Sequence, residues 1–252
     1  MIADQRLDQI LQIASKTEFV EVDDLANRLN VSQMTIRRDL QRLSELGLMQ
    51  RRHGGAVISS SIREEKDYVT KKALNLGSKK RLATAALSFI NDNDILYLDG
   101  GTTTFELASL LDSAQHLTVI TNDISAAKEL LNKDISTIMV GGALQKSTQT
   151  SMGSTAAEFL KQFSVTTAFI GTTAVGHNFD VMCPTIEKAI LKRTAMQIAQ
   201  KSILLADNSK FFGYSLNRFA NLSDFSTTIT DKSFLEADMK RLEACFINIV
   251  QV

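Results

Sequence analysis

The sequence has no tryptophan, one proline and only two cysteines among its 252 residues. Cys183 and Cys245 are far apart, so two reduced thiols are expected rather than a disulfide or a zinc site. The three histidines are scattered and form no metal-binding motif, so no metal site is predicted. No apolar run approaches the roughly 18–20 residues of a membrane helix, and the charged first residues predict no signal peptide. The expected location is the cytoplasm, without a membrane partner.

The chain also lacks a net charge, because 28 basic residues balance 28 acidic ones. A role in nucleic-acid binding would therefore have to appear as a local asymmetry of charge. Residues 28–57 contain six basic and two acidic residues, a net charge of +4. Residues 1–27 contain two basic and six acidic residues, a net charge of −4. Positive charge is thus concentrated in one short segment near the start of the chain.

The first 57 residues show the periodicity of three short helices followed by two β-type runs. The expected elements are helices over residues 4–14, 22–29 and 33–45 and a hairpin over residues 48–58. Ser32 is placed as the N-cap of the third helix, and Gly47 is placed as the glycine just after its end. Three helices and a hairpin in fewer than 60 residues describe a winged helix-turn-helix domain over residues 1–57.

The third helix has an apolar face, formed by Ile36, Leu40 and Leu43, opposite a basic face. Arginine can bind guanine with two hydrogen bonds or hold a phosphate, and glutamine can read adenine. Asp39 is expected to orient an arginine, and His53 to support the wing tip or contact phosphate. A solvated basic face is the alternative, but the helix order, the turn and the basic hairpin favour double-stranded DNA. The predicted DNA-binding residues are Ser32, Gln33, Met34, Thr35, Arg37, Arg38, Gln41, Arg42, Arg51, Arg52 and His53.

The rest of the chain has a different pattern. Residues 58–78 are polar and weakly periodic, which predicts a linker with room for a short helix. Over residues 79–252 helices alternate with apolar strands, which predicts an α/β domain with a doubly wound, mostly parallel sheet. The expected helices cover residues 81–90, 124–131 and 186–200. The expected strands cover residues 95–98, 117–121, 136–140, 167–170, 202–206 and 227–230.

The stretch L-D-G-G-T-T-T-F at residues 98–105 follows one of these strands and opens a helical run. Glycines allow close approach of backbone N–H groups, threonines offer hydroxyls, and the helix start offers partial positive charge. Such a turn is suited to hold a phosphate. It is not a Walker P-loop, because no Gly-Lys-Ser/Thr sequence follows it. The stretch alone leaves open whether the protein transforms a phosphorylated molecule or senses it.

Two motifs carry a resemblance to a known family. T-I-R-R-D-L at residues 35–40 and R-x-H-G-G at residues 51–55 resemble the helix-turn-helix signature of DeoR-family bacterial transcriptional regulators. The sensor domains of that family resemble ribose-5-phosphate isomerase, and their landmarks recur here in order from Lys79 to A-D-N-S-K-F at residues 206–211. The resemblance implies a homo-oligomer, a dimer or tetramer, that binds operator DNA. It also implies a phosphorylated sugar or polyol as effector, and no cofactor.

Most of these landmarks end predicted strands, and parallel sheets bind ligands at the carboxyl ends of their strands. Lys210 is a candidate for a phosphate or a hydroxyl, and Asn122 and Glu187 are candidates for sugar hydroxyls. Alternatives stay open: Lys210 as a surface lysine, Asp99 as a helix cap, and Gly141-Gly142 as a tight turn. The predicted effector-binding residues are Lys79, Asp99, Gly100, Gly101, Thr102, Thr103, Thr104, Thr121, Asn122, Gly141, Gly142, Gly171, Thr172, Glu187 and Lys210.

One loop distinguishes the interpretation of this domain as a sensor from its interpretation as an enzyme. An aldose–ketose isomerase needs a general base, and the isomerase relatives carry an acidic loop after the strand that matches residues 167–170. Here that loop reads G-T-T-A-V-G at residues 171–176, with no carboxylate, so no catalytic residue is predicted. The interpretation is a regulator, a repressor of a carbohydrate-utilisation operon that its effector releases from DNA. The alternative is a sugar-phosphate isomerase or transferase with an added DNA-binding domain. Thr172-Thr173 replaces an Asp of many family members, so the sugar stays open.

Overall fold

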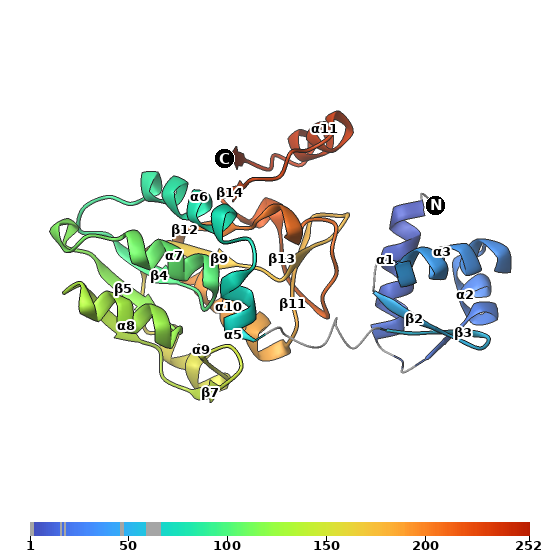
Figure 1. Ribbon diagram of the computed structural model, residues 1–252, viewed down its shortest axis with the longest axis horizontal. Helices are drawn as coiled ribbons and strands as arrows, with labels where there is room; N and C mark the ends of the chain where they lie inside the picture. Colours follow the sequence, from blue (N-terminus) through green and yellow to red (C-terminus); the bar gives the residue numbers. More distant parts are fainter. Residues whose placement is uncertain (1–2, 16, 18, 46–47, 59–66) are drawn as a thin grey trace.

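The computed structural model describes residues 3–15, 17, 19–45, 48–58 and 67–252 (Figure 1). Up to residue 58 it contains three helices and a small sheet of strand order β1-β3-β2. The elements are α1 (Ala3–Ser15), β1 (Val20–Glu21), α2 (Val22–Leu29), α3 (Gln33–Glu45), β2 (Met49–Arg52) and β3 (Gly55–Ile58). The predicted helices and hairpin are confirmed, and β1 is an addition. Gly47 lies outside the described residues, so its place at a helix end stays a prediction.

A single apolar cluster holds these helices and the wing together. Ile10 of α1, Leu25 of α2 and Ile36 of α3 are completely buried within it. The wing packs closely against β1, since a Cβ atom on Gly55 would lie 2.0 Å from the backbone oxygen of Val20. The second glycine of the H-G-G turn is therefore required by sterics, because any side chain there would push β1 away.

A buried ion pair joins α1 to α3. Arg6 Nε lies 2.5 Å from Asp39 Oδ2, and Arg6 Nη2 lies 3.0 Å from Asp39 Oδ1. Both residues are nearly inaccessible, with 6% and 5% of their surface exposed. Hydrogen bonding to Asp39 raises the pKa of the Arg6 guanidinium. The predicted role of Asp39 as the partner of an arginine is confirmed, and the pair sets the position of α3 against α1.

From residue 67 onward, helices alternate with strands around one large sheet. The helices are α5 (Tyr68–Ala73), α6 (Leu76–Ala86), α7 (Thr102–Leu110), α8 (Ile124–Asn132), α9 (Ser154–Leu160), α10 (Ile186–Gln197) and α11 (Glu236–Ala244). The large sheet contains β4 (Ile95–Leu98), β5 (Thr118–Thr121), β6 (Ser136–Met139), β9 (Val165–Gly171), β12 (Ala199–Leu205), β14 (Thr227–Thr230) and β15 (Ile249–Gln251). Smaller sheets contain β7 (Ala143–Gln145), β8 (Thr150–Met152), β10 (Ala174–Val175), β11 (Asp180–Cys183) and β13 (Asn217–Asn221).

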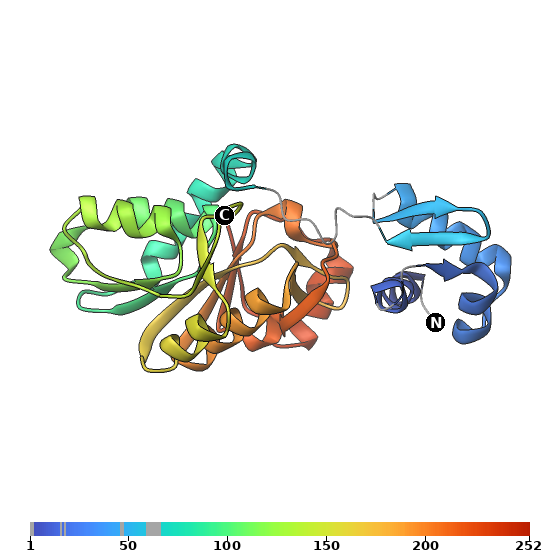
Figure 2. The ribbon, with the colours of Figure 1, turned by 90° about the horizontal axis from the view of Figure 1, so that it is seen from below.

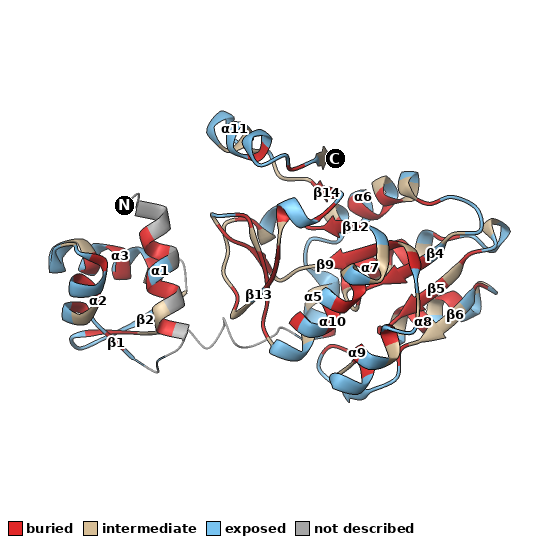
Figure 3. Cartoon of the chain, turned by 180° about the vertical axis from the view of Figure 1, so that it is seen from behind, coloured by how far each residue is buried: buried red, intermediate tan, exposed pale blue. Residues whose placement is uncertain are grey.

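The large sheet is parallel throughout, in the order β15-β14-β12-β9-β4-β5-β6. Helices α6, α7 and α8 cover one face and α9 and α10 cover the other (Figure 2). The central strands are buried between these layers, whereas β6 and β15 at the two edges are only partly covered (Figure 3). The predicted doubly wound α/β domain is confirmed. Strand order reverses between β4 and β9, and such a switch point is where open α/β sheets bind ligands at their carboxyl edge.

The structure corrects several expected boundaries. Helix α6 begins at Leu76 rather than at residue 81, and the helix expected over 186–200 ends at Gln197 because Ala199 already pairs with β9. The expected linker, 58–78, contains α5, and residues 59–66 lie outside the described part. Helices α9 and α11 and the small sheets were not predicted, because their apolar runs are too short to show a period. No helix of the described residues is long and apolar enough to cross a membrane.

Candidate nucleic-acid interface and effector cavity

The exposed side of α3 presents most of the predicted DNA-binding side chains. Ile36, Leu40 and Leu43 face the core, so the opposite side of the helix is open to solvent. Ser32 Oγ accepts a hydrogen bond of 3.2 Å from the Thr35 backbone N–H, which confirms the predicted N-cap. The exposed residues on this side are Gln33, Met34, Arg37, Arg38, Gln41 and Arg42. Three guanidiniums, two amides and a thioether therefore share one accessible helix face.

The wing adds basic charge to this surface. Arg51 and Arg52 lie on β2 and His53 lies at the turn, and all three are exposed. Gly54 makes the turn with a φ of +77°, a conformation that favours glycine. Recognition helix and wing thus both present exposed cationic groups, the arrangement that DNA backbone binding needs.

A cavity of about 440 Å³ lies at the switch point, past the carboxyl ends of β4, β9 and β12. Helices α5, α6 and α10 and the start of α7 supply further walls. The predicted effector-binding residues that line it are Lys79, Gly100, Gly101, Thr102, Thr103, Thr104, Gly171, Thr172 and Lys210. The lining residues that were not in the predicted set are Lys71, Leu74, Asn75, Thr173, Cys183, Lys188, Lys192, Asp207 and Ser209.

The start of α7 forms one wall of this cavity. Within the described residues, the hydroxyls of Thr102 and Thr103 make no hydrogen bond to the protein, so they are available to a ligand. Thr104 Oγ1 instead donates to the backbone oxygen of Gly101 at 2.8 Å and tightens the turn. Gly100 has no room for a side chain, because a Cβ atom there would lie 2.4 Å from Thr150 Cγ2. The Gly101 N–H, expected to face a phosphate, donates to Asp123 Oδ2 at 3.1 Å.

Two lysines approach each other beside the start of α7. Lys79 is only 4% exposed, and its ammonium donates to the backbone oxygen of Lys71. Burial and the charge of Lys210 lower the pKa of Lys79. The nearest carboxylate oxygen to the Lys210 ammonium is Asp207 Oδ2, at 4.0 Å. Two ammonium groups that line the same cavity as a helix N-terminus form a site that an anion would stabilise.

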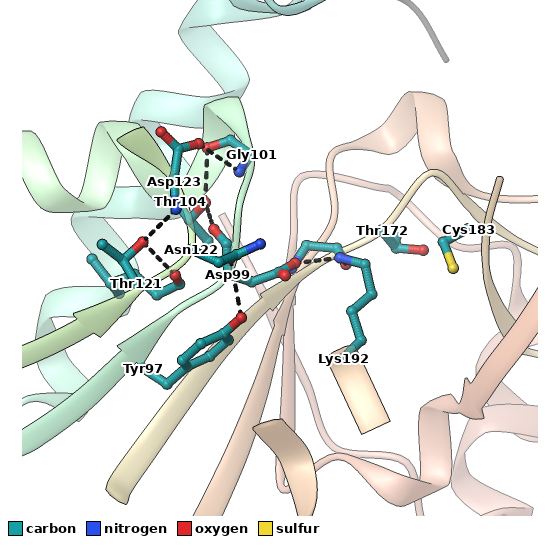
Figure 4. A network of polar contacts seen from close by, with 12 residues as sticks. Tyr97, Asp99, Gly101, Thr104, Thr121, Asn122, Asp123, Thr172, Cys183 and Lys192 are labelled. Atoms are coloured by element: carbon teal, nitrogen blue, oxygen red, sulfur yellow. Dashed lines mark hydrogen bonds and ion pairs between the residues drawn. The ribbon is translucent and has the colours of Figure 1, made fainter. Parts of the chain in front are cut away.

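Asp99 belongs to a buried ion pair beneath the cavity (Figure 4). Its carboxylate accepts hydrogen bonds from the Lys192 ammonium and, at 3.0 Å, from the Gly171 N–H. Lys192 also donates to the Gly171 carbonyl oxygen at 2.9 Å. The alternative that Asp99 caps the following helix is wrong, because the N-cap of α7 is Gly101 and no side chain caps it. Asp99 is therefore a positioning residue that holds Lys192 and joins the ends of β4 and β9.

Six residues of the predicted effector-binding set do not line the cavity. Asn122 is buried and bonded to the Tyr97 hydroxyl at 3.1 Å and to the Ser151 carbonyl oxygen at 3.0 Å (Figure 4). Thr121 Oγ1 donates to the Leu98 carbonyl oxygen at 2.8 Å. Glu187 lines a separate groove between α9 and α10. The residues whose predicted ligand contact the geometry does not support are Asp99, Thr121, Asn122, Gly141, Gly142 and Glu187.

The loop at residues 171–176, which has no carboxylate, uses one of its threonines to hold its own backbone. Thr172 Oγ1 lies 3.0 Å from the Ala174 carbonyl oxygen and 2.9 Å from that of Met182. The Thr172 hydroxyl therefore donates its hydrogen bond to the backbone of the loop. Thr173 is the neighbouring side chain that lines the cavity as well. Of the two threonines in this loop, Thr173 is the better candidate for contact with an effector.

A pattern in the sequence points to two of the lysines that were missed. Lys188 and Lys192 are four residues apart on an expected helix, so they share one face, and that helix starts just past a strand. Lys71 and Asn75 have the same spacing but fall in the segment that was expected to be a linker. Asn75 Nδ2 donates to Asp207 Oδ1 at 3.1 Å, which fixes the start of α6 against the loop that carries Lys210.

The buried carboxylate of Asp123 makes a prediction about stability and pH. Burial raises its pKa from 3.8 to about 6, although backbone N–H groups of Ala126 and Gly101 oppose the shift. The raised pKa means that this group's contribution to stability is fully present below the unfolded pKa and is lost as the pH rises through about 6. We expect the free energy of unfolding of Asp123→Asn, relative to the natural chain, to increase by roughly 2 kcal/mol between about pH 4.5 and about pH 7.5. Urea unfolding of both chains at both pH values measures this difference in free energy. A difference that is the same at the two pH values would contradict the prediction.

The fold and these two surfaces define a class: a DNA-binding module joined to an α/β domain with a ligand cavity. Two family models match the chain. The DeoR-like helix-turn-helix domain covers residues 6–62, and the DeoR C-terminal sensor domain covers residues 74–232. The chain belongs to the DeoR family of transcriptional regulators, as the sequence motifs indicated.

Relatives of known sequence agree with this assignment. The chain is 34% identical to the uncharacterized HTH-type transcriptional regulator FruR of Bacillus subtilis, over 94% of this chain and 95% of that one. It is 30% identical to the HTH-type transcriptional repressor CsqR of Escherichia coli, over 97% and 94% of the two chains. A ribose-5-phosphate isomerase structure is 20% identical over 53% of this chain and 52% of that one, with a TM-score of 0.40. The protein is thus a DNA-binding transcriptional regulator with a small-molecule effector, and not an enzyme.

Proposed function

We propose that this protein represses a carbohydrate-utilisation operon and leaves its operator when a phosphorylated sugar or polyol binds the effector cavity. The observation that carries the effector assignment is the gathering of five lysines at a cavity that also contains the start of α7. Lysine ammonium groups, free threonine hydroxyls and a helix N-terminus are all donors to a phosphate. In this proposal residues 1–57 bind DNA, 58–78 connect, and 79–252 sense the effector in the cytoplasm.

The proposed release of the protein from its operator depends on how copies of the chain assemble. Operators of helix-turn-helix dimers have two half-sites, so two recognition helices must be held at the spacing of one turn of DNA. The effector would favour an arrangement of the homo-oligomer, a dimer or tetramer, in which the recognition helices no longer match that spacing. It can do so only by binding that arrangement more tightly than the DNA-bound one.

A thermal-shift screen of the full chain against sugar phosphates tests the effector proposal. A ligand that binds only the folded state raises the melting temperature, so at least one sugar phosphate should do so where its unphosphorylated sugar does not. The same compound should then release the chain from operator DNA. A panel in which no phosphorylated sugar or polyol shifts the melting temperature would overturn the proposal.

A further inference from the structure

Tyr214 of the α/β domain packs against the apolar core of the winged helix. Its side chain is partly buried and lies against the cluster that contains Ile10 of α1, Leu25 of α2 and Ile36 of α3. Tyr214 is distant from these residues in sequence, so the contact joins the two domains only in the tertiary structure. A movement of Tyr214 would therefore change a contact of the domain that carries α3.

The loop that carries Tyr214 starts at the effector cavity. Asp207 and Lys210 both line the cavity, and Lys210 ends a short 3₁₀ helix that begins at Asn208. Only residues 211–213 separate Lys210 from Tyr214 along the chain. A phosphate that draws Lys210 toward it would thus act on the same short segment that contacts the winged helix.

The Lys210 ammonium is placed where an anion can move it. It lies 4.0 Å from Asp207 Oδ2, an ion pair longer than a hydrogen bond. That oxygen is buried and has no hydrogen-bond partner among the described residues. Thr102 and Thr103 at the start of α7 line the same cavity. A phosphate beside their hydroxyls would offer Lys210 a short, charge-assisted hydrogen bond, which its present distance from Asp207 does not.

Strand β10 holds the backbone of residues 211–213. Phe211 forms a β-bridge with Val175, and the Gly213 N–H donates to the Val175 carbonyl oxygen at 3.2 Å. Both ends of this short stretch are thus tied to one residue of β10. Because β10 directly follows residues 171–173, which line the cavity, the anchor is itself continuous with the cavity wall.

Phe212, in the middle of this stretch, has a backbone conformation that its surroundings must maintain. Its φ is +59°, in the left-handed region, which residues other than glycine adopt rarely. The ring stacks on His177 with 5.0 Å between ring centroids, and the Lys232 ammonium lies 5.0 Å from the ring centroid. These contacts make the segment stiff, so a displacement of Lys210 is passed on to Tyr214 rather than absorbed between them.

We propose that the segment from Lys210 to Tyr214 transmits effector binding from the cavity to the winged helix. The inference rests on the proposed function and deepens it, because it names the element through which a bound phosphate would move the recognition helix. Binding of a phosphate beside Lys210 and packing of Tyr214 on the winged-helix core favour different positions of the segment. The position with Tyr214 packed is the one that binds the operator. By linkage, the operator then lowers the affinity for the effector by the same factor as the effector lowers operator binding.

Tyr214→Ala in the full chain tests this role, because it removes the packing and leaves the cavity intact. The probes are ribose 5-phosphate, fructose 1-phosphate, fructose 6-phosphate and glucitol 6-phosphate, taken from the thermal-shift panel. The natural chain should lose about tenfold or more of its operator affinity when a probe that raises the melting temperature is added. Tyr214→Ala should already bind the operator that weakly, and the probe should change its affinity by less than about twofold. In calorimetry without DNA, Tyr214→Ala should bind the probe at least as tightly as the natural chain does, because the packing that opposes the probe is gone.

Further variants separate the packing of Tyr214 from other effects. Tyr214→Phe keeps the ring and should be released by the probe as the natural chain is. Phe246→Ala is the matched control, since it removes an aromatic side chain that is 95% exposed, and its release should be unchanged. The chain has no tryptophan, so Tyr214→Trp places a single fluorophore at the contact. Its emission maximum should shift when a probe binds, whereas that of Phe246→Trp should stay constant.

The outcomes distinguish this inference from the proposed function. A probe that releases Tyr214→Ala to the same extent as the natural chain would overturn the role of the segment and leave the proposed function standing. An emission maximum of Tyr214→Trp that does not change when a probe binds would do the same. If no sugar or polyol phosphate of the panel raises the melting temperature, both proposals fall. A Tyr214→Ala chain that binds the probe but no longer responds to it supports both.

Discussion

Replacing Thr103 by valine together with Lys210 by alanine should leave operator binding intact and abolish release by the effector. Both side chains line the cavity at the start of α7, and neither is part of the winged helix. The double variant removes a hydroxyl donor and a charged donor from the proposed phosphate site. One neutral and one charge-assisted hydrogen bond together account for about 3 kcal/mol, which is roughly a hundredfold in effector affinity.

Fluorescence anisotropy of a labelled operator, titrated with the active sugar phosphate, measures this effect. The double variant should bind the operator as the natural chain does, and should stay bound at effector concentrations that release the natural chain. Lys201→Ala at the amino end of β12 is the matched charge control and should respond normally. Normal release of the double variant would mean that the effector binds somewhere else.

Replacing Arg37 and Arg38 by alanine should weaken operator binding by at least about thirtyfold at matched salt. Both guanidiniums are exposed on α3 and lie opposite the buried Ile36 face. A good arginine contact to a base contributes about 1–3 kcal/mol, so two contacts together contribute about 2–6 kcal/mol. Because these side chains lie outside the core cluster, the stability of the domain should change little.

Measurements of operator binding at several salt concentrations distinguish two possible reasons for the loss of affinity. Removal of phosphate contacts lowers the dependence of affinity on salt, whereas removal of base contacts lowers discrimination between operator and unrelated DNA. The control is Arg193→Ala on α10, an exposed arginine whose guanidinium donates to the Arg218 carbonyl oxygen at 3.1 Å. If the double variant bound the operator as tightly as the control, α3 would not be part of the DNA-binding surface.

Local patterns were sufficient to predict the winged helix and most of the sheet. The apolar positions of α3, the cap at Ser32 and the apolar run at β4 are encoded by neighbours in sequence. The same holds for the turn that starts at Gly100, since its glycines and threonines are consecutive. The predicted residues of this turn line the cavity together because a strand, a turn and a helix N-terminus form one continuous unit.

The α10 wall of the cavity could not be predicted in that way. Asp99 and Lys192 are far apart in sequence, and their pairing depends on α10 packing under the ends of β4 and β9. Glu187 looked like a ligand-binding acid at a helix start, but the direction of the same helix places it in another groove. Asn122 follows a strand as expected, yet its amide is taken up by Tyr97 and the backbone.

The amino-acid sequence by itself determined that this chain is a DeoR-family regulator with a basic third helix and a Gly-Gly-Thr turn between a strand and a helix. Those features depend on periodicity, capping and contiguous motifs, which are local properties of the chain. Only the tertiary structure decided which side chains share the cavity, because a parallel sheet brings together residues from strand ends and helices that are distant in sequence. The cationic α10 wall, with Lys188 and Lys192, exists only through that packing.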